Sequence, residues 1–305
     1  MAAAQSVTAG SGLTGYRVAR ARRFDTFPAW LLLPACLGLL LVDGFPFLYA
    51  IALSFQERIQ GQPVDPWIGL ANYRTVMGDA EFWRALRVTT QWTLGSVTGQ
   101  LLVGTALALL IDGLRAGRRV VATLLLLPWA TPLVVAALTC RWLLQPDLGL
   151  INDMVPPTWF GLSPGHDWLG ESSTALVAVV AAHIWKYYGF VMIVVLARLR
   201  TIPEGLHEAA HIDGADRVQR FRHVTLPQLR GVLGVTVLLM GIWTFNTFDL
   251  VYLMARDHPA TNLLALEIWR RFYGSFDFGL AAATAVLMFA MLFLAGAIYA
   301  WRANR

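Results

Sequence analysis

Four polar side chains stand out because they fall inside otherwise apolar stretches of the chain: His183, Lys186, Asn246 and Asp249. Charged groups within a bilayer are costly, and they usually face one another or a water-filled cavity. The chemistry open to this set is non-covalent, since imidazole, ammonium, amide and carboxylate groups hydrogen-bond solute hydroxyls. Lys186 and Asp249 could instead form a structural ion pair that fixes the packing of two helices. The sequence leaves both interpretations open.

Aromatic side chains accompany these polar groups along the chain. Aromatic rings present flat apolar faces that stack on the C–H surfaces of sugar rings, although they also fill membrane cores and interfaces. The aromatic set comprises Trp129, Tyr187, Tyr188, Phe190, Trp243, Phe245, Phe248 and Tyr252. Polar and aromatic residues together predict a path for a carbohydrate.

Covalent chemistry is not indicated. A phosphate-binding P-loop needs a glycine-rich turn that ends in Lys-Ser or Lys-Thr, whereas the one lysine of the chain is Lys186, inside an apolar segment. An intramembrane hydrolase would need a His-Glu-x-x-His pattern or a pair of acids, but Asp43 and Asp249 lie in separate segments. We therefore predict no catalytic residue, no metal site and no cofactor bound by this chain.

The elements that position these residues are predicted from composition. Of 305 residues, 57% are hydrophobic and 14% are charged, while a soluble domain has about 25% charged residues. A bilayer core requires about 20 apolar residues per spanning helix. Six segments fit: 28–55, 88–111, 120–144, 173–197, 229–254 and 279–301. We predict an all-α polytopic membrane protein with six transmembrane helices, in which residues 1–27 form a cytoplasmic N-terminal arm and 28–305 one transmembrane domain.

The arginines predict the orientation, because cytoplasmic loops carry an excess of basic residues. This bias explains the net charge of +5 better than binding to nucleic acid does. It places both termini in the cytoplasm, with these arginines on the inner side: Arg17, Arg20, Arg22, Arg23, Arg115, Arg118, Arg119, Arg198, Arg200, Arg217, Arg220, Arg222, Arg230, Arg302 and Arg305. Three arginines do not fit this pattern, since Arg256, Arg270 and Arg271 fall on the outer side.

A polar, helix-forming stretch lies between the fourth and fifth apolar segments. We expect Thr201 to cap its helix, with Pro203 in the first turn and Glu204 completing a capping box. Gly214 should then interrupt the helix, because a residue without Cβ allows a sharp turn. Asp216 restarts it, and Pro227 begins the fifth span. Apolar side chains of the helix could enter a groove of a partner: Leu206, Ala209, Ala210 and Ile212.

This stretch reads Glu208-Ala209-Ala210, three residues, Gly214, nine residues, then Val224-Thr225-Leu226-Pro227. It resembles the EAA loop of bacterial ABC importer permeases. The family pattern is Glu-Ala-Ala, three residues, Gly, nine residues, Ile, any residue, Leu, Pro, so Val224 is the one departure. The resemblance implies a cytoplasmic coupling helix within about 201–227 that docks on an ATPase. The implied coupling residues are Glu208, Ala209, Ala210, Asp213, Gly214, Leu226 and Pro227.

Three further segments look like those of the MalF/UgpA class of sugar permeases: residues 127–132, 183–185 and 245–249. Substrate-contacting positions of the maltose members correspond here to Trp129, His183, Lys186, Tyr187, Phe190, Phe245, Asn246 and Asp249. Lys186 and Tyr187 replace small or aliphatic residues of those members. The resemblance therefore implies a reshaped pocket.

The resemblance also implies an assembly and a solute. A type I ABC importer permease has no ATPase site of its own. It works in the bacterial cell membrane with a second homologous permease, two ATP-binding subunits that carry ATP and Mg, and an extracytoplasmic sugar-binding lipoprotein. The short N-terminal arm and the composition, rich in Ala and Arg and almost free of lysine, look most like the trehalose permeases of mycobacteria. A maltose-type oligosaccharide or glycerol-phosphate is the alternative solute.

Overall fold

The computed structural model describes residues 27–61, 66–256 and 258–303. Almost all of the predicted N-terminal arm, residues 1–26, lies outside the described residues. Within them the regular structure is helical apart from two isolated β-bridges, Gln56 with Trp67 and Ile59 with Asp277. The prediction of an all-α chain is therefore confirmed.

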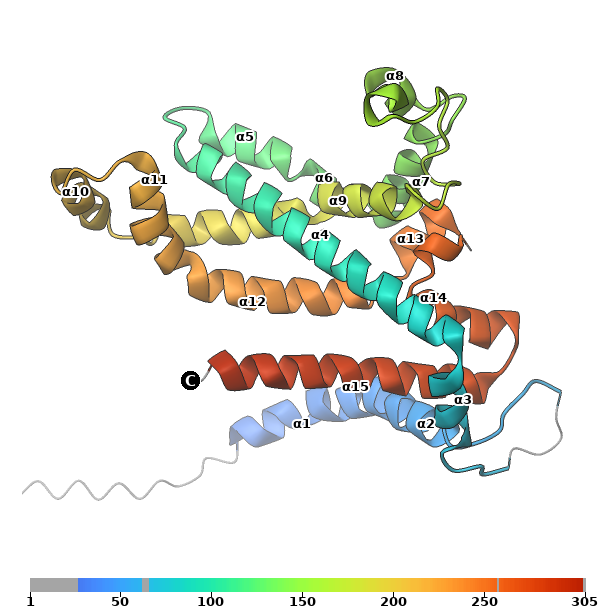
Figure 1. The fold of residues 1–305 in the computed structure, drawn as a ribbon. Coiled ribbons are helices and arrows are strands. Elements are labelled where there is room, and N and C mark those ends of the chain that lie inside the picture. Colours follow the sequence, from blue (N-terminus) through green and yellow to red (C-terminus); the bar gives the residue numbers. More distant parts are fainter. Residues whose placement is uncertain (1–26, 62–65, 257, 304–305) are drawn as a thin grey trace, which may run out of the picture. The chain divides into compact units, whose positions relative to one another are not determined.

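The α-helices, labelled in Figure 1, are α1 (Phe27–Leu39), α2 (Phe45–Leu53), α3 (Ala71–Gly78), α4 (Ala80–Asp112), α5 (Arg118–Leu125), α6 (Leu127–Ala130), α7 (Leu133–Leu143), α8 (Leu150–Met154), α9 (Ala175–Leu199), α10 (Glu204–Ile212), α11 (Arg217–Arg220), α12 (Leu226–Phe245), α13 (Asp249–Ala255), α14 (Leu264–Trp269) and α15 (Phe278–Ala303). Wider π-helical turns lie at Leu40–Gly44, Phe221–Thr225 and Arg270–Gly274, and 3₁₀ turns at Pro157–Phe160 and Pro259–Thr261.

The described chain divides into two compact units, with the boundary between Leu48 and Tyr49. Helix α1, the π-helical turn and α2 make one apolar helix, Leu32–Leu53, whose last residues already belong to the second unit. The described side chains of the first unit are almost all exposed; Leu41 and Val42, for example, are 70% and 72% exposed. An exposed apolar surface of this kind is typical of contact with a membrane or with protein.

Five described helices are long and apolar enough to cross a membrane. They are Leu32–Leu53, Ala80–Asp112, Ala175–Leu199, Arg217–Phe245 and Phe278–Arg302. The third expected segment, 120–144, is not one such helix, because it consists of the short helices α5, α6 and α7. The prediction of a single continuous helix over 120–144 is wrong.

Two prolines explain why this segment breaks. Pro128 lies in the first turn of α6, where a missing N–H costs little. Pro132 then restricts the residue before it, and Thr131 is extended, with ψ 136°. A continuous helix would also bring the Pro132 ring against the carbonyl of Pro128, four residues earlier. The chain therefore ends α6 at Ala130 and starts α7 afresh at Leu133.

The fifth expected segment, 229–254, is displaced towards the N-terminus. Its helix begins at Arg217 and runs without interruption to Phe245. Pro227 therefore lies within the helix rather than at its start. A π-helical turn at Phe221–Thr225 comes directly before it, and such a widened turn accommodates a residue without an N–H donor. After Phe245 the helix breaks, and α13 resumes at Asp249.

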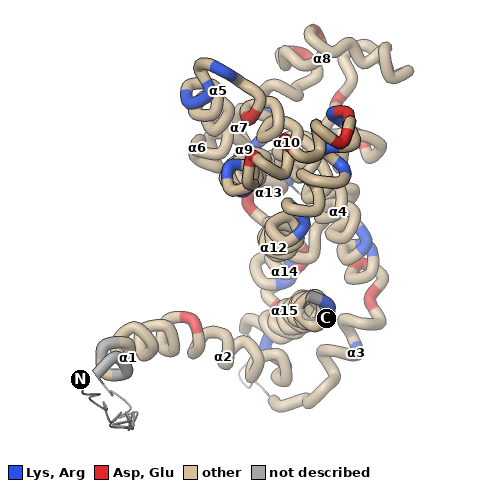
Figure 2. The backbone as a smooth tube through the Cα atoms, turned by 90° about the vertical axis from the view of Figure 1, so that its left-hand side faces the viewer, with Lys and Arg blue, Asp and Glu red and all other residues tan. Residues whose placement is uncertain are grey.

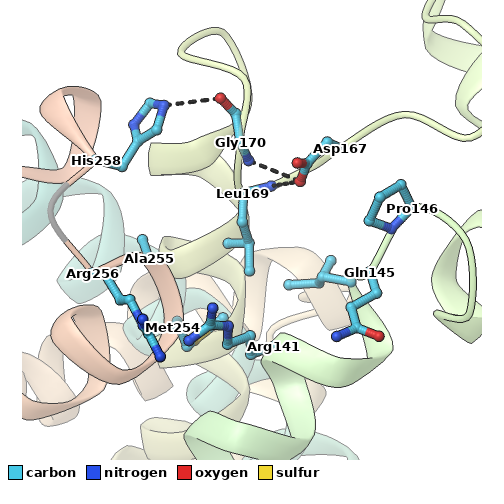
Figure 3. A pocket seen from close by; sticks show the side chains of 11 residues that line it. Arg141, Gln145, Pro146, Asp167, Leu169, Gly170, Met254, Ala255, Arg256 and His258 are labelled. Atoms are coloured by element: carbon cyan, nitrogen blue, oxygen red, sulfur yellow. Dashed lines mark hydrogen bonds between the residues drawn. The ribbon is translucent and has the colours of Figure 1, made fainter.

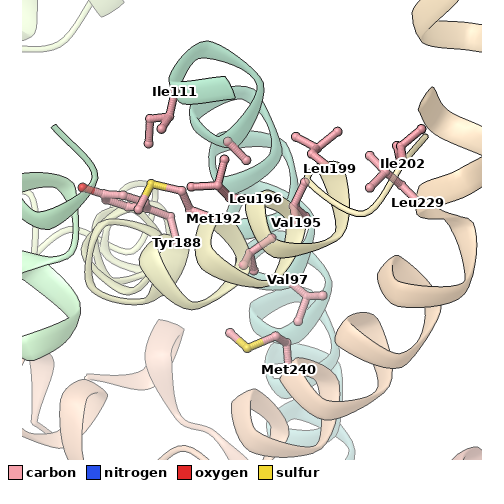
Figure 4. Close-up of a cluster of buried hydrophobic side chains, with 12 residues drawn as sticks. Val97, Ile111, Tyr188, Met192, Val195, Leu196, Leu199, Ile202, Leu229 and Met240 are labelled. Carbon is pink, nitrogen blue, oxygen red and sulfur yellow. The ribbon is translucent and has the colours of Figure 1, made fainter. Parts of the chain in front are cut away.

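The core of the second unit lies where α9 packs against α4 and α12 (Figure 4). Val191, Met192 and Val195 on α9 are fully buried there, facing Ala108 and Ile111 of α4. Gly104 allows the two helices to approach closely. A Cβ at this position would lie 2.7 Å from Val191 Cβ and 2.8 Å from the carbonyl oxygen of Tyr188. Small residues serve this purpose between membrane helices, where packing drives association.

An ionic network ties α15 to the start of α4. Arg271 is 7% exposed and bonds Glu267 at 2.9 Å and Asp79 at 2.5 Å, and it also donates to the hydroxyl of Thr284 at 3.2 Å. Arg271, which the charge rule leaves on the outer side of the membrane, is thus a buried structural residue. Of the three arginines that break the charge rule, Arg271 is explained by the acids that neutralise it.

Candidate functional site

Lys186 connects the broken third segment to α9. Its side chain is only 4% exposed. The ammonium Nζ donates to the carbonyl oxygens of Pro128 at 3.0 Å and Trp129 at 2.8 Å, and it lies 5.2 Å from the ring centre of Tyr187. A buried cation thus occupies the C-terminal end of α6, where the free carbonyls and the helix dipole favour positive charge.

The two carbonyls are available because of the proline break. In a continuous helix the Pro128 carbonyl would accept from residue 132, but Pro132 has no N–H. The Trp129 carbonyl loses its partner because α6 ends at Ala130. Within the described part of the chain, no ion pair joins Lys186 to Asp249. The hypothesis that these two residues form a structural ion pair is therefore wrong.

A cavity of about 250 Å³ lies at the break between α12 and α13. The lining combines aromatic, amide, hydroxyl and carboxylate groups with two leucines. Asn246 donates to the carbonyl of Ile242 at 2.8 Å, so its side-chain oxygen remains available as an acceptor. Asp249 is exposed and opens α13. The lining residues are Leu133, Tyr187, Trp243, Asn246, Thr247, Phe248, Asp249 and Leu250.

Only part of the predicted substrate set lines this cavity. Tyr187, Asn246 and Asp249 do, although they come from helices about 60 residues apart in sequence. Phe190 stands behind the wall, with its ring 5.3 Å from that of Trp243. The others lie elsewhere: Trp129 is exposed, Lys186 is bonded to α6, and Phe245 is half-buried against the cluster around Leu264.

His183 is a buried residue behind the cavity. It is 2% exposed, and its ring lies 4.6 Å from both Trp92 and Tyr187. Its Nδ1 is 2.8 Å from the side-chain nitrogen of Gln100 on α4. His183 thus packs against Tyr187 on the side away from the cavity and does not line the cavity itself. Gln100 was not among the predicted site residues, although a fully buried amide in an apolar segment is a signal for a polar partner.

The segment between α9 and α12 folds largely as expected. Helix α10 ends before Gly214, whose φ of +81° needs a residue without Cβ. Asp216 caps α11 and makes a capping box with Gln219, with both bonds formed at 2.8–2.9 Å. The expected cap at the start of α10 is wrong. Thr201 bonds the carbonyl of Arg198 at 2.8 Å, and Pro203 occupies the cap position without a side-chain bond.

Helix α10 exposes most of its surface. Its apolar residues Leu206 and Ile212 are 42% and 85% exposed, and Glu208 and Ala209 are exposed beside them. Figure 2 shows basic residues at α5 and charged residues beside α10. The helix is therefore an exposed amphipathic segment at the end of two long apolar helices, α9 and α12.

A second cavity, of about 290 Å³, lies where the ends of α7 and α13 meet the loop at 167–170 (Figure 3). Arg141, Arg256 and His258 give it a basic lining, while Asp167 binds the backbone N–H groups of Leu169 and Gly170. His258 lies 3.0 Å from the carbonyl oxygen of Gly170. Arg256, one of the arginines that break the charge rule, is thus part of this basic cavity.

The comparison with protein families decides what kind of chain this is. A family described as binding-protein-dependent transport system inner membrane component matches residues 100–305, more than half of the chain. The chain belongs to this family. It is a multi-pass protein of the inner membrane and a permease subunit of an ABC transporter. Members of the family lack ATPase activity, as predicted for this chain.

Relatives among characterised permeases cover nearly the whole chain. The trehalose/maltose transport system permease protein MalF of Thermococcus litoralis is 32% identical over 264 residues, 86% of this chain and 88% of MalF. The sulfoquinovosyl glycerol permease SmoG of Agrobacterium fabrum is 34% identical over 88% of this chain and 87% of SmoG. The trehalose permease SugA of Mycobacterium tuberculosis is 31% identical over 93% of this chain and 90% of SugA. The permease therefore belongs with the sugar permeases of its family, as predicted.

The fold is also that of a solved transporter. A chain from the crystal structure of a bacterial ABC transporter involved in the import of the acidic polysaccharide alginate matches the permease with a TM-score of 0.73. The match covers 90% of this chain and 97% of that chain at 24% identity. This likeness shows an ABC importer permease fold.

Proposed function

We propose that this permease translocates a disaccharide, trehalose first among the candidates, across a bacterial cell membrane. The observation that carries the proposal is the cavity at the α12–α13 break, which places Tyr187 and Trp243 beside the amide of Asn246 and the carboxylate of Asp249. Flat aromatic faces with a few convergent hydrogen-bonding groups suit a sugar. Trehalose is favoured by the relatives MalF and SugA, whose names include it.

The lining argues against a phosphorylated solute. Asp249 carries negative charge at the cavity, and its lining residues include no lysine or arginine. Lys186, the cation that could have met a phosphate, is bonded to the carbonyls of Pro128 and Trp129 instead. A carboxylate facing a phosphate would repel it. A neutral sugar therefore suits the cavity better than glycerol-phosphate, and a maltose-type oligosaccharide remains the second candidate.

The proposed topology has six spans within one transmembrane domain, 28–305, and both termini in the cytoplasm. The five long helices supply five spans, and α5, α6 and α7 together form the sixth as a discontinuous span. Non-helical backbone is tolerated at membrane depth where it is buried in protein or lines a cavity. The breaks at Thr131–Pro132 and 246–248 fit that rule, since Leu133 and Asn246 both line the sugar cavity.

The energy for transport comes from partner subunits. We assign α10 and the following turn as the coupling helix, with Glu208, Ala209, Ala210, Asp213, Gly214, Leu226 and Pro227 as coupling residues. The partners are a second homologous permease, two ATP-binding subunits that hold ATP and Mg, and an extracytoplasmic sugar-binding lipoprotein. Exposed Leu206 and Ile212 on α10 support this assignment, because helix-in-groove docking uses such apolar anchors.

Uptake of labelled solutes tests the proposal directly. Cells that lack the gene are compared with cells that carry it again, for trehalose, maltose, glycerol-phosphate and sulfoquinovosyl glycerol. Selective loss and recovery of trehalose uptake is the expected result. If uptake of a different sugar alone were lost and recovered, that sugar would replace trehalose as the proposed substrate. If no solute showed an uptake defect, with all partner subunits expressed, the import function would be contradicted.

A further inference from the structure

A pocket of about 410 Å³ lies between the α4–α5 connection and the end of α9. Four arginines line it, three from 115–119 and Arg200 from a segment about 80 residues further along the chain. The lining residues are Arg115, Gly117, Arg118, Arg119, Val120 and Arg200. Figure 2 shows the basic residues at α5.

Little negative charge balances these four cations. No acidic residue lines the pocket. Asp112, at the end of α4, pairs with Arg118 only. The Nε of Arg118 is buried without a hydrogen-bond partner among the described residues. Arginines that converge on one pocket with spare N–H groups suit phosphate oxygens, which guanidinium groups bind in a bidentate manner.

The pocket lies at the membrane boundary. Helices α4 and α9 are two of the spanning helices, and they end at Asp112 and Leu199, directly before the lining arginines. Val120, which lines the pocket, is 64% exposed, and Leu124 on the same short helix α5 and Leu110 in the last turn of α4 are 57% and 67% exposed. A phosphate held by the arginines would thus have an apolar surface next to it, where acyl chains can lie.

We propose that this pocket binds the phosphate headgroup of an anionic phospholipid, with the acyl chains against α5. Basic pockets between membrane helices bind anionic headgroups, and juxtamembrane arginines add to membrane binding individually. The arginine count alone would also follow from the charge rule for membrane orientation. Convergence of two distant segments on one cavity, next to exposed apolar residues, distinguishes a lipid site from scattered basic residues. A free phosphate would use the arginines but not the apolar surface.

Retention of lipid by the assembled transporter tests this site. The complex with its partner subunits is reconstituted in nanodiscs of phosphatidylcholine and phosphatidylglycerol, and native mass spectrometry counts the lipids that stay bound after transfer to detergent. The variant Arg119→Gln/Arg200→Gln removes two charges of the pocket. The control Arg230→Gln/Arg302→Gln removes two exposed charges outside it.

We expect the pocket variant to retain about tenfold less phosphatidylglycerol, since each arginine adds to the affinity for anionic lipid, while the control retains the same amount as the unmodified complex. The variant Arg119→Lys/Arg200→Lys keeps both charges and should retain most of the lipid, which separates loss of charge from loss of folding. The proposal would be overturned if both glutamine variants retained as much phosphatidylglycerol as the unmodified complex, or if both lost it to the same extent. Displacement of phosphatidylglycerol by millimolar inorganic phosphate, with phosphate then bound at the pocket, would overturn the lipid as the ligand.

Discussion

The ammonium of Lys186 lies 2.8 Å from the carbonyl oxygen of Trp129. Together with the bond to Pro128 at 3.0 Å, this contact holds the end of α6 against α9. The one lysine of the chain thus satisfies carbonyls that the break at Pro132 has left without donors. Its role in the structure is to hold the discontinuous third segment in place, and it does not line the cavity at the α12–α13 break.

Replacing Lys186 by methionine should therefore lower stability and leave sugar recognition largely intact. A buried carbonyl left without a donor costs about 1–3 kcal/mol, and these two are only part-buried, so we expect a loss at the lower end of that range. We expect a lower melting temperature of the reconstituted complex, with the KM for uptake changed by less than about twofold. Lys186→Arg retains a donor and should recover part of the stability. A large rise in KM at unchanged melting temperature would instead make Lys186 a substrate ligand.

Asp249→Asn should weaken sugar binding. A hydrogen bond to a charged group is worth roughly 1.5–3 kcal/mol, so we expect the KM for uptake to rise about tenfold or more. The matched control is Asp147→Asn, because Asp147 is also exposed but does not line the sugar cavity. Kinetics of labelled sugar uptake measure both variants. An equal KM in Asp249→Asn and the unmodified transporter would remove Asp249 from the path.

Glu208→Ala should impair coupling without affecting insertion into the membrane. Glu208 is exposed on α10, where an interface residue would lose its charge contact with the ATPase. We expect sugar-stimulated ATP hydrolysis by the complex to fall about fivefold or more. Glu204→Ala, one turn earlier and equally exposed, serves as the control. Unchanged stimulation in Glu208→Ala would exclude the coupling role of this residue.

Gly214→Val should strain the turn after α10. The backbone φ of +81° costs a residue with a Cβ about 1–2 kcal/mol, and a β-branched residue more. We expect reduced sugar-stimulated ATP hydrolysis, since the strain reorients α10. Gly205→Ala is the contrasting variant, because Gly205 has no positive φ and open space around it. Equal activity of the two variants would show that the turn tolerates a side chain.

The turn after α10 was predictable because its signals are local. Gly214 and Asp216 act through their own backbone and the residues next to them, so their roles follow from the sequence. Thr201 shows the limit of such signals. Its hydroxyl bonds the carbonyl of Arg198 in the preceding turn, a competing bond that sequence patterns do not rank.

Contacts between segments far apart in the chain could not be predicted from the sequence as well. The pairing of Lys186 with α6 depends on carbonyls that become free only once the helix breaks at Pro132. The sequence showed Arg271 only as an arginine on the outer side of the membrane, where the charge rule does not expect one. Its structural role could not be predicted because its partner, Asp79, lies 192 residues away in the chain. For the same reason, the residues that line the cavity at the α12–α13 break could be predicted only in part. Tyr187, Asn246 and Asp249 meet there, but whether a side chain on the same helices, such as His183, faces the cavity depends on helix rotation.

The uninterrupted helix from Arg217 to Phe245 has a mechanical consequence. Its 29 residues, at about 1.5 Å of rise each, make a rod about 43 Å long. One end follows directly on the turn at Gly214, and the other ends at Asn246 in the wall of the sugar cavity. A tilt of this rod by a few degrees about its Arg217 end displaces Asn246 by a few ångströms, and the turn at Gly214 determines how much of a movement of α10 reaches the rod.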